Sequence, residues 1–151
     1  MLEVERPADM KAHVGKSLGV SEWVLIDQPM INAFADATGD HQWIHVDVER
    51  AKNEMPGGKT IAHGFLTLSL LPMLGAETYR IRKVSRGINY GTNKVRFTAP
   101  VPVGSRVRLN QVLKAVDDVA GGVRLTFDGT VELEGSDRPA LVAETLAMMF
   151  D

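Results

Sequence analysis

An aspartate and a histidine lie five residues apart in the stretch 37–50, which reads ATGDHQWIHVDVER. Asp40 and His45 are residue types that accept and donate protons, so together they could activate a water molecule. Residues five apart do not share one face of a helix, and on a strand an odd spacing points them to opposite sides. We therefore expect the two side chains to converge only if His41–Ile44 forms an irregular loop.

Three other interpretations of this stretch stay open on spacing alone. Asp40 could be a turn residue that follows Gly39, and His45 could be a hydrogen-bonded core histidine. Together with His41 and Asp47 they could also bind a metal. That spacing matches no established zinc pattern, however, and the chain has no cysteine.

A second element adds a group that stabilises negative charge. Ala62-His63-Gly64 opens a strongly apolar segment, and N–H groups in the first turn of a helix lack partners within the helix. The N–H of Gly64 could hold a carbonyl oxygen that gains negative charge, and glycine lets that carbonyl approach closely. The alternative is that Gly64 packs against a strand and His63 caps the helix. An acid–base pair beside such an N–H would act next to a carbonyl group.

The helix that precedes Asp40 has clear boundaries. Asp27 can cap its first turn, and Pro29 is tolerated there because the missing N–H would be unpaired anyway. Gly39 is the residue type that ends a helix in the left-handed conformation. The sequence therefore places Asp40 directly beyond the C-terminal end of a helix.

Apolar side chains surround the whole circumference of the helix expected from Ala62 to Tyr79, which is typical of a buried helix. Pro72 should bend it. A short strand is expected at 21–27, and four long ones follow the helix, at 87–101, 104–116, 123–134 and 140–150. The third alternates apolar and polar residues, as an antiparallel strand with one exposed face does. We expect one α+β domain over residues 1–151, with a long antiparallel sheet wrapped around the buried helix.

Composition indicates the cellular compartment and the class of ligand that we expect. The absence of cysteine and of an apolar N-terminal segment predicts a cytoplasmic protein, and the apolar run 65–74 is too short to span a membrane. Nine of the 17 Lys and Arg residues lie between Thr78 and Val116, a segment without Asp or Glu. These cations are either solvated strand faces or a surface for an anion. No aromatic stacking pattern accompanies them and the net charge is −2, so a small phosphorylated ligand fits better than nucleic acid.

Two motifs together resemble a known family. The segments FADATGDHQWIHVDVERA and AHGFLTLSLLPML are similar to the hydratase-2 motif of MaoC-like (R)-specific enoyl-CoA hydratases, and INYGTNKVRFTAPVPVGSRVR resembles the strand segment that follows it. The similarity covers roughly 23–116 and is greatest to the small NodN-like subgroup. It implies a hot-dog fold, a homodimer and an acyl-CoA thioester substrate. It also implies that Asp40 and His45 are the catalytic dyad and that the Gly64 N–H binds the thioester oxygen, with no metal or redox cofactor.

One departure from the family pattern and two rival functions accompany this resemblance. The pattern reads G-D-x-N-P-hydrophobic-H, whereas Gln42 and Trp43 stand here in place of Asn-Pro, so Trp43 could line the acyl channel. A hot-dog thioesterase is one rival, but such enzymes use a carboxylate on the central helix, and 64–76 contains none. The other rival is a non-catalytic module for acyl-CoA binding or dimerisation.

Overall fold

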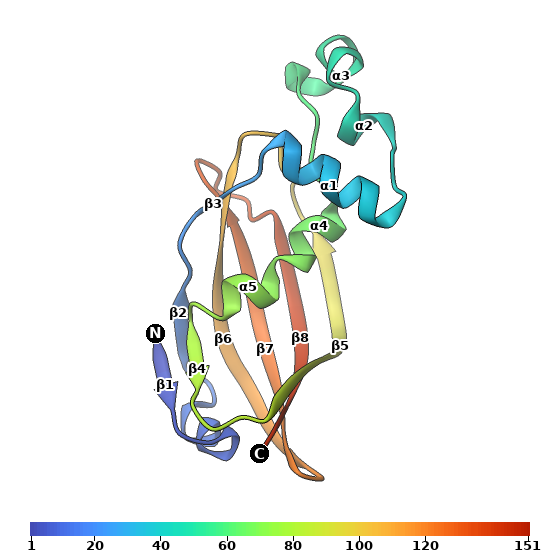
Figure 1. Ribbon diagram of the computed structural model, residues 1–151. Helices are drawn as coiled ribbons and strands as arrows, with labels where there is room; N and C mark the ends of the chain where they lie inside the picture. Colours follow the sequence, from blue (N-terminus) through green and yellow to red (C-terminus); the bar gives the residue numbers. More distant parts are fainter.

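A curved antiparallel sheet with a pair of helices across one face forms the centre of the computed structural model, which describes residues 1–151 (Figure 1). The strand order is β2-β6-β7-β8-β5, and the short β3 pairs with one end of β6. The strands are β2 (Ser17–Val20), β3 (Val24–Leu25), β5 (Arg86–Phe97), β6 (Arg106–Val119), β7 (Gly122–Leu133) and β8 (Leu141–Phe150). The four long strands expected from the pattern thus lie side by side, and β5 forms one edge of the sheet.

The hairpin of β6 and β7 supplies the middle of the sheet. It turns at Ala120–Gly121, where Gly121 has a positive φ of 80° that favours glycine. Alternate residues of β7 are buried, namely Val123, Leu125, Phe127, Gly129 and Val131. The alternation predicted for this strand is therefore confirmed.

The central helix crosses the inner face of the sheet in two pieces, α4 (Gly64–Ser69) and α5 (Leu71–Gly75). They separate at Leu70, two residues before Pro72, so the expected bend is present. Leu66 and Leu74 are buried in the core. The expected burial on all sides is wrong for the single chain, because Phe65 and Met73 are 66% and 49% exposed. One face of the helix packs on the sheet and the other faces outward.

A cap of short helices lies beyond one end of the sheet, above α4 (Figure 1). It contains α1 (Gln28–Thr38), α2 (Trp43–Val46), α3 (Val48–Glu54) and a 3₁₀ turn at Pro56–Gly58. The Asp27 side chain accepts a hydrogen bond from the Met30 N–H at 3.0 Å, and Gly39 ends α1 with a φ of 80°. Both predicted boundaries of this helix are confirmed.

The opposite end of the sheet is closed by elements that the sequence pattern did not reveal. β1 (Leu2–Val4) pairs in parallel with β4 (Tyr79–Ile81), and a 3₁₀ helix (Pro7–His13) buries Met10 in a second core cluster. The whole arrangement, a sheet wrapped around a central helix, is the α+β hot-dog fold that was expected. No helix in the chain has both the length and the apolar character needed to cross a membrane.

Candidate functional site

Asp40, His45 and His63 converge where the helical cap meets the start of α4. One ligand-type atom from each lies within 4.8 Å of the others. Asp40 comes from the segment between α1 and α2, His45 from α2, and His63 from the residue directly before α4. The structure thus joins the two residues singled out by spacing to a third, 18 residues beyond His45.

His45 is buried, with 7% of its surface exposed, and is held through both its ring and its main chain. Its Nδ1 lies 2.7 Å from the carbonyl oxygen of Ile61. A carbonyl only accepts hydrogen bonds, so Nδ1 donates and Nε2 keeps a free lone pair. The Gln28 amide donates to the His45 carbonyl at 2.8 Å, and Thr60 donates to the Gln28 amide oxygen at 2.6 Å. The ring is therefore fixed with Nε2 ready to accept a proton.

The backbone that carries His45 differs from the expectation. An irregular loop was expected for His41–Ile44, but Trp43 and Ile44 already belong to the helical turn α2. The irregular part is 39–42, which suffices to redirect the chain. The turn forms because the His45 N–H donates to the Gln42 carbonyl and the Ile61 N–H donates to the Ile44 carbonyl, each at 3.0 Å.

Asp40 is exposed and its side chain is lightly held. Its Oδ1 accepts a hydrogen bond from the Gln42 N–H at 3.3 Å, and its own N–H lies 3.5 Å from the Thr38 hydroxyl oxygen. The second carboxylate oxygen makes no hydrogen bond within the chain. Asp40 is tied to the core through its main-chain carbonyl, 3.0 Å from the Nε2 of His63. A carboxylate so placed can still bind water or a substrate group.

The part played by His63 was missed by sequence reasoning, which considered it only as a possible helix cap. Its side chain makes no capping hydrogen bond. It is buried, with 2% exposed, and stacks on the His45 ring with a centroid distance of 3.8 Å and an interplanar angle of 25°. The sequence signal was its place beside Gly64, but its partners lie too far back in the chain to be read from spacing.

The same three residues are of metal-ligating types, and their geometry is unfavourable for a shared ion. A metal bound to an imidazole nitrogen lies close to the plane of that ring, along the lone pair. Two rings stacked nearly face to face do not offer one point in both planes. The other candidate ligands lie elsewhere, because His41 is exposed beside Asp36 and Asp47 caps α3 through the Arg50 N–H. The cluster suits proton transfer better than metal binding.

Gly64 is the first residue of α4, so its N–H has no acceptor within the helix. A Cβ at this position would lie 2.8 Å from a ring carbon of Phe97 on β5. Close packing against a strand, the alternative considered for this residue, therefore explains why glycine is required. It does not occupy the N–H, which stays available as a donor.

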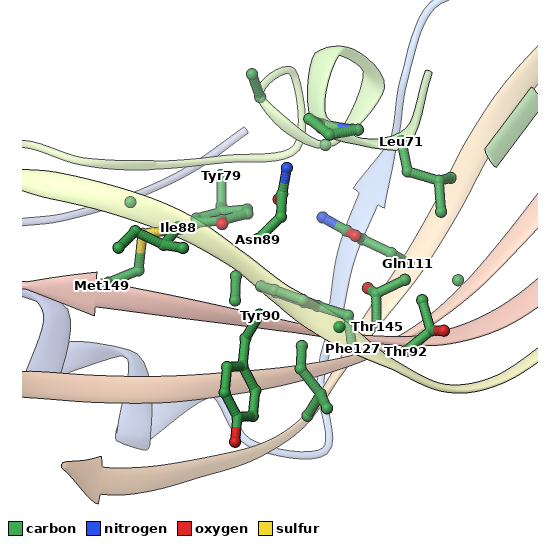
Figure 2. A pocket seen from close by; sticks show the side chains of 18 of the residues that line it. Leu71, Tyr79, Ile88, Asn89, Tyr90, Thr92, Gln111, Phe127, Thr145 and Met149 are labelled. Atoms are coloured by element: carbon green, nitrogen blue, oxygen red, sulfur yellow. The ribbon is translucent and has the colours of Figure 1, made fainter. Parts of the chain in front are cut away.

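A cavity of about 730 Å³ lies between the central helices and the sheet. Figure 2 shows Leu71, Phe127 and Met149 around it, with Gln111 directed inward and Tyr90 pointing away from the opposite side of β5. Its walls are more apolar than polar. It begins beneath Leu68 and Ser69, about one helical turn from Gly64. Asp40, His45, His63 and Gly64 are not among its lining residues.

Two further residues complete the description of the cavity. Burial raises the pKa of Tyr79 to about 12, so this residue lines the cavity as a neutral phenol. Trp43, which could line an acyl channel, is not among the residues that line this cavity. Its ring is covered by the Arg50 guanidinium at 4.0 Å. A role of Trp43 in an acyl channel stays a prediction.

The basic segment divides into paired and unpaired cations. Five of its nine cations form ion pairs with carboxylates: Arg82, Lys83, Arg106, Arg108 and Lys114. The hydrogen bond from Arg82 holds the pKa of Glu3 below its usual value. For these five, the interpretation as ordinary surface charges is supported. The cations without a carboxylate partner are Arg80, Arg86, Lys94 and Arg96.

A family profile and two known relatives each match most of the chain. The family profile described as "MaoC like domain" matches residues 9–133. The chain is 56% identical over 147 residues to 3-hydroxyacyl-thioester dehydratase Z of Mycobacterium tuberculosis, covering 97% of each chain. It is 47% identical over 144 residues to nodulation protein N of Rhizobium leguminosarum bv. viciae, covering 94% of this chain and 89% of that one.

Solved structures with the same fold include two hydratases. R-hydratase PhaJ1 from Pseudomonas aeruginosa has a TM-score of 0.74 and 21% identity, with 91% of this chain and 82% of that chain covered. The (R)-hydratase from A. caviae involved in PHA biosynthesis has a TM-score of 0.71 and 22% identity, with 89% and 94% covered. At these identities the likeness establishes the fold.

Proposed function

The chain belongs to the MaoC-like dehydratase family of hydro-lyases, and from this premise we propose that it interconverts trans-2-enoyl-CoA and (R)-3-hydroxyacyl-CoA. Water would add to or leave the acyl chain between Asp40 and His45. The observation that carries the proposal is the free Nε2 of the fixed His45 ring close to an Asp40 carboxylate that keeps a free oxygen. This is an arrangement for moving one proton of one water molecule.

The proposed reaction balances with one proton acceptor. In the hydration direction, His45 Nε2 takes a proton from water while the water oxygen bonds to the β-carbon. Asp40 orients the water by accepting a hydrogen bond from its second O–H group. The electrons of the double bond move to the thioester oxygen as an enolate, which the Gly64 N–H stabilises. The protonated His45 then returns its proton to the α-carbon on the same face. The net result is syn addition of water.

The names of the relatives support the type of reaction and the substrate class. The relative from Mycobacterium tuberculosis is named a 3-hydroxyacyl-thioester dehydratase, and the two structural neighbours are titled R- or (R)-hydratases. Hydration and dehydration are the two directions of one reaction. The cavity of about 730 Å³ is within the usual range for small-molecule sites and would hold the acyl chain. The phosphates of coenzyme A would lie against cations that lack a carboxylate partner.

The free edge of β5 supports the proposed homodimer. Strand β5 is 12 residues long and almost wholly exposed, and it presents Ile88, Tyr90 and Phe97 to solvent. The outward residues Phe65 and Met73 add apolar surface on the central helix. A long uncovered edge with apolar side chains is a surface for pairing with another strand. We expect light scattering to give the mass of two chains, and the mass of one chain would contradict the dimer.

The experiment that tests the function measures hydration and thioester cleavage together. The enzyme is mixed with trans-2-enoyl-CoA of several chain lengths, and loss of the conjugated enoyl absorbance is followed beside release of free thiol. We expect loss of absorbance without thiol. Thiol release would support the thioesterase rival, which the lack of Asp or Glu in 64–76 argues against. Tight binding without turnover at any chain length would support a binding module.

A further inference from the structure

His63 is the buried titratable residue of the site that the proposed reaction leaves unused. Its ring lies between two others, stacked on His45 at 3.8 Å and tilted against Phe34 of α1 at 4.9 Å. A histidine enclosed in this way loses much of its side-chain freedom. Its neighbours are the two residues whose relative position decides whether one water can bridge them.

The hydrogen bonds of His63 define its tautomer. Its Nε2 lies 3.0 Å from the carbonyl oxygen of Asp40, so Nε2 must carry the hydrogen. Its Nδ1 is buried and has no partner in the chain. A proton on Nδ1 would place an unpaired donor and a charge in the interior, which is costly. His63 is therefore a neutral ring that donates from Nε2.

His45 has the opposite tautomer, with its hydrogen on Nδ1 and its lone pair on Nε2. The two stacked rings therefore differ in which nitrogen lone pair is accessible. The lone pair of His45 is available to water, while the lone pair of His63 is enclosed.

Asp40 depends on His63 more than on any local contact. Its own contacts, with Thr38 and Gln42, are 3.5 and 3.3 Å long and reach only two residues along the chain. The His63 bond is shorter and crosses 23 residues to the start of α4. It ties the Asp40 segment to the start of α4.

We propose that His63 is a positioning residue: its Nε2–H fixes the main chain of Asp40 and its ring fixes the plane of His45, so that the two reacting groups keep the spacing that one water requires. This inference rests on the proposed hydration at Asp40 and His45. It assigns His63 no contact with the substrate. Displacing a reacting group by about 1 Å can cost about 100-fold in rate, so the effect falls on the chemical step.

The kinetic test compares three variants. His63→Gln keeps a planar, neutral side chain whose amide N–H reaches about as far as Nε2, whereas His63→Ala removes both the donor and the stack. We expect kcat to fall about 10- to 100-fold in His63→Ala with KM changed less than about threefold, and to recover to within about fivefold of wild type in His63→Gln. The matched control is Phe34→Leu, which changes the other side of the same ring and should leave kcat within about threefold. Thermal unfolding shows whether each variant is folded.

A second readout works without turnover. NMR of the histidine rings should show His63 as the Nε2–H tautomer and His45 as the Nδ1–H tautomer at pH 7. His63→Ala should move the Asp40 amide signal, while His63→Gln, which keeps a donor to the Asp40 carbonyl, should leave it near its wild-type position.

The two readouts separate the possible failures. Equal loss of kcat in His63→Gln and His63→Ala, or wild-type kcat in His63→Ala, overturns the inference. If the wild-type protein hydrates no enoyl thioester, the proposed function fails, and the NMR comparison decides the positioning role by itself. An unchanged Asp40 amide signal in His63→Ala would overturn that role whatever the activity.

Discussion

His45 is buried and held through its ring and its main chain, whereas Asp40 lies in an exposed segment and is tied to the core through one carbonyl. The difference follows from what each group must do. A base that accepts a proton in one direction needs a fixed lone pair, and the Ile61 carbonyl provides this by holding Nδ1. A carboxylate that orients water has to reach solvent and substrate. The site therefore combines a rigid half, which is His45 with the residues that hold it, and an accessible half, which is the exposed Asp40 segment.

The largest expected effect comes from removing either reacting group. His45→Gln removes the proton acceptor, and Asp40→Asn replaces the carboxylate that orients the water with a neutral amide of the same shape. We expect kcat for enoyl-CoA hydration to fall about 1,000-fold in each variant, because general acid–base catalysis contributes 10²–10⁴ and depends on both the acceptor and the position of the water. Equal losses would show that the accessible half is as necessary as the rigid half. A variant that keeps kcat within about threefold of wild type would remove its residue from the mechanism.

The second-largest expected effect comes from removing the hydrogen bonds of Gln28, which hold His45 in the rigid half of the site. Gln28→Leu removes the donor to the His45 carbonyl and leaves the buried hydroxyl of Thr60 without its acceptor. We expect the free energy of unfolding to fall by about 1–3 kcal/mol and kcat to fall about tenfold. Urea unfolding and steady-state kinetics measure both quantities. Asn32→Ala is the matched control, because Asn32 bonds to the same Gln28 amide from the exposed side; an equal loss there would contradict the role of the His45 contact.

A smaller effect separates the two explanations of Gly64. Gly64→Ala places a methyl group against the Phe97 ring, and we expect a loss of about 1–3 kcal/mol in unfolding free energy with about a fivefold lower kcat. Adding Phe97→Ala to this variant removes the clash, and the backbone N–H of residue 64 stays in place. We expect this double variant to recover the wild-type kcat. A kcat that stays low in the double variant would show that the substrate itself requires glycine at this position.

The smallest effect concerns the accessible half. Thr38→Ala removes the hydroxyl that lies 3.5 Å from the Asp40 N–H, a long contact at an exposed position. We expect the unfolding free energy to change by less than about 0.5 kcal/mol and kcat to stay within about twofold. A larger fall in kcat, measured beside His63→Ala, would show that the helix end as well as His63 holds Asp40 in place.

Sequence reasoning found the elements whose boundaries depend on local chemistry. Asp27 and Gly39 mark the two ends of α1 because capping and positive φ are properties of single residues, and that placed Asp40 beyond the helix end. Sequence reasoning could not find the contacts that bring distant segments of the chain together. The bond between His63 and Asp40 crosses 23 residues, and β1 pairs with β4 in the middle of the chain, where Leu2 lies opposite Tyr79. The outward face of the central helix was missed because an apolar pattern does not say which chain covers it.

The family resemblance implied roles for Asp40, His45 and Gly64, but it did not indicate how these residues are held. That information lies in side chains whose types alone carry no signal. Gln28 and Thr60 are ordinary polar residues in the sequence, and only their hydrogen bonds relate them to His45. Phe97 shows in the same way why Gly64 has to be glycine. These supports depend on tertiary packing, which a single sequence does not reveal.

The measurement that tests the central claim most directly is the stereochemistry of water addition in D₂O. Wild-type enzyme and His45→Gln are incubated with a trans-2-enoyl-CoA, and the product is analysed for the configuration of its alcohol and for deuterium at the α-carbon. The account predicts (R)-3-hydroxyacyl-CoA from the wild type, with one deuterium added on the same face as the hydroxyl group, and almost no product from the variant. An (S)-alcohol, anti addition, or equal product from His45→Gln would contradict it.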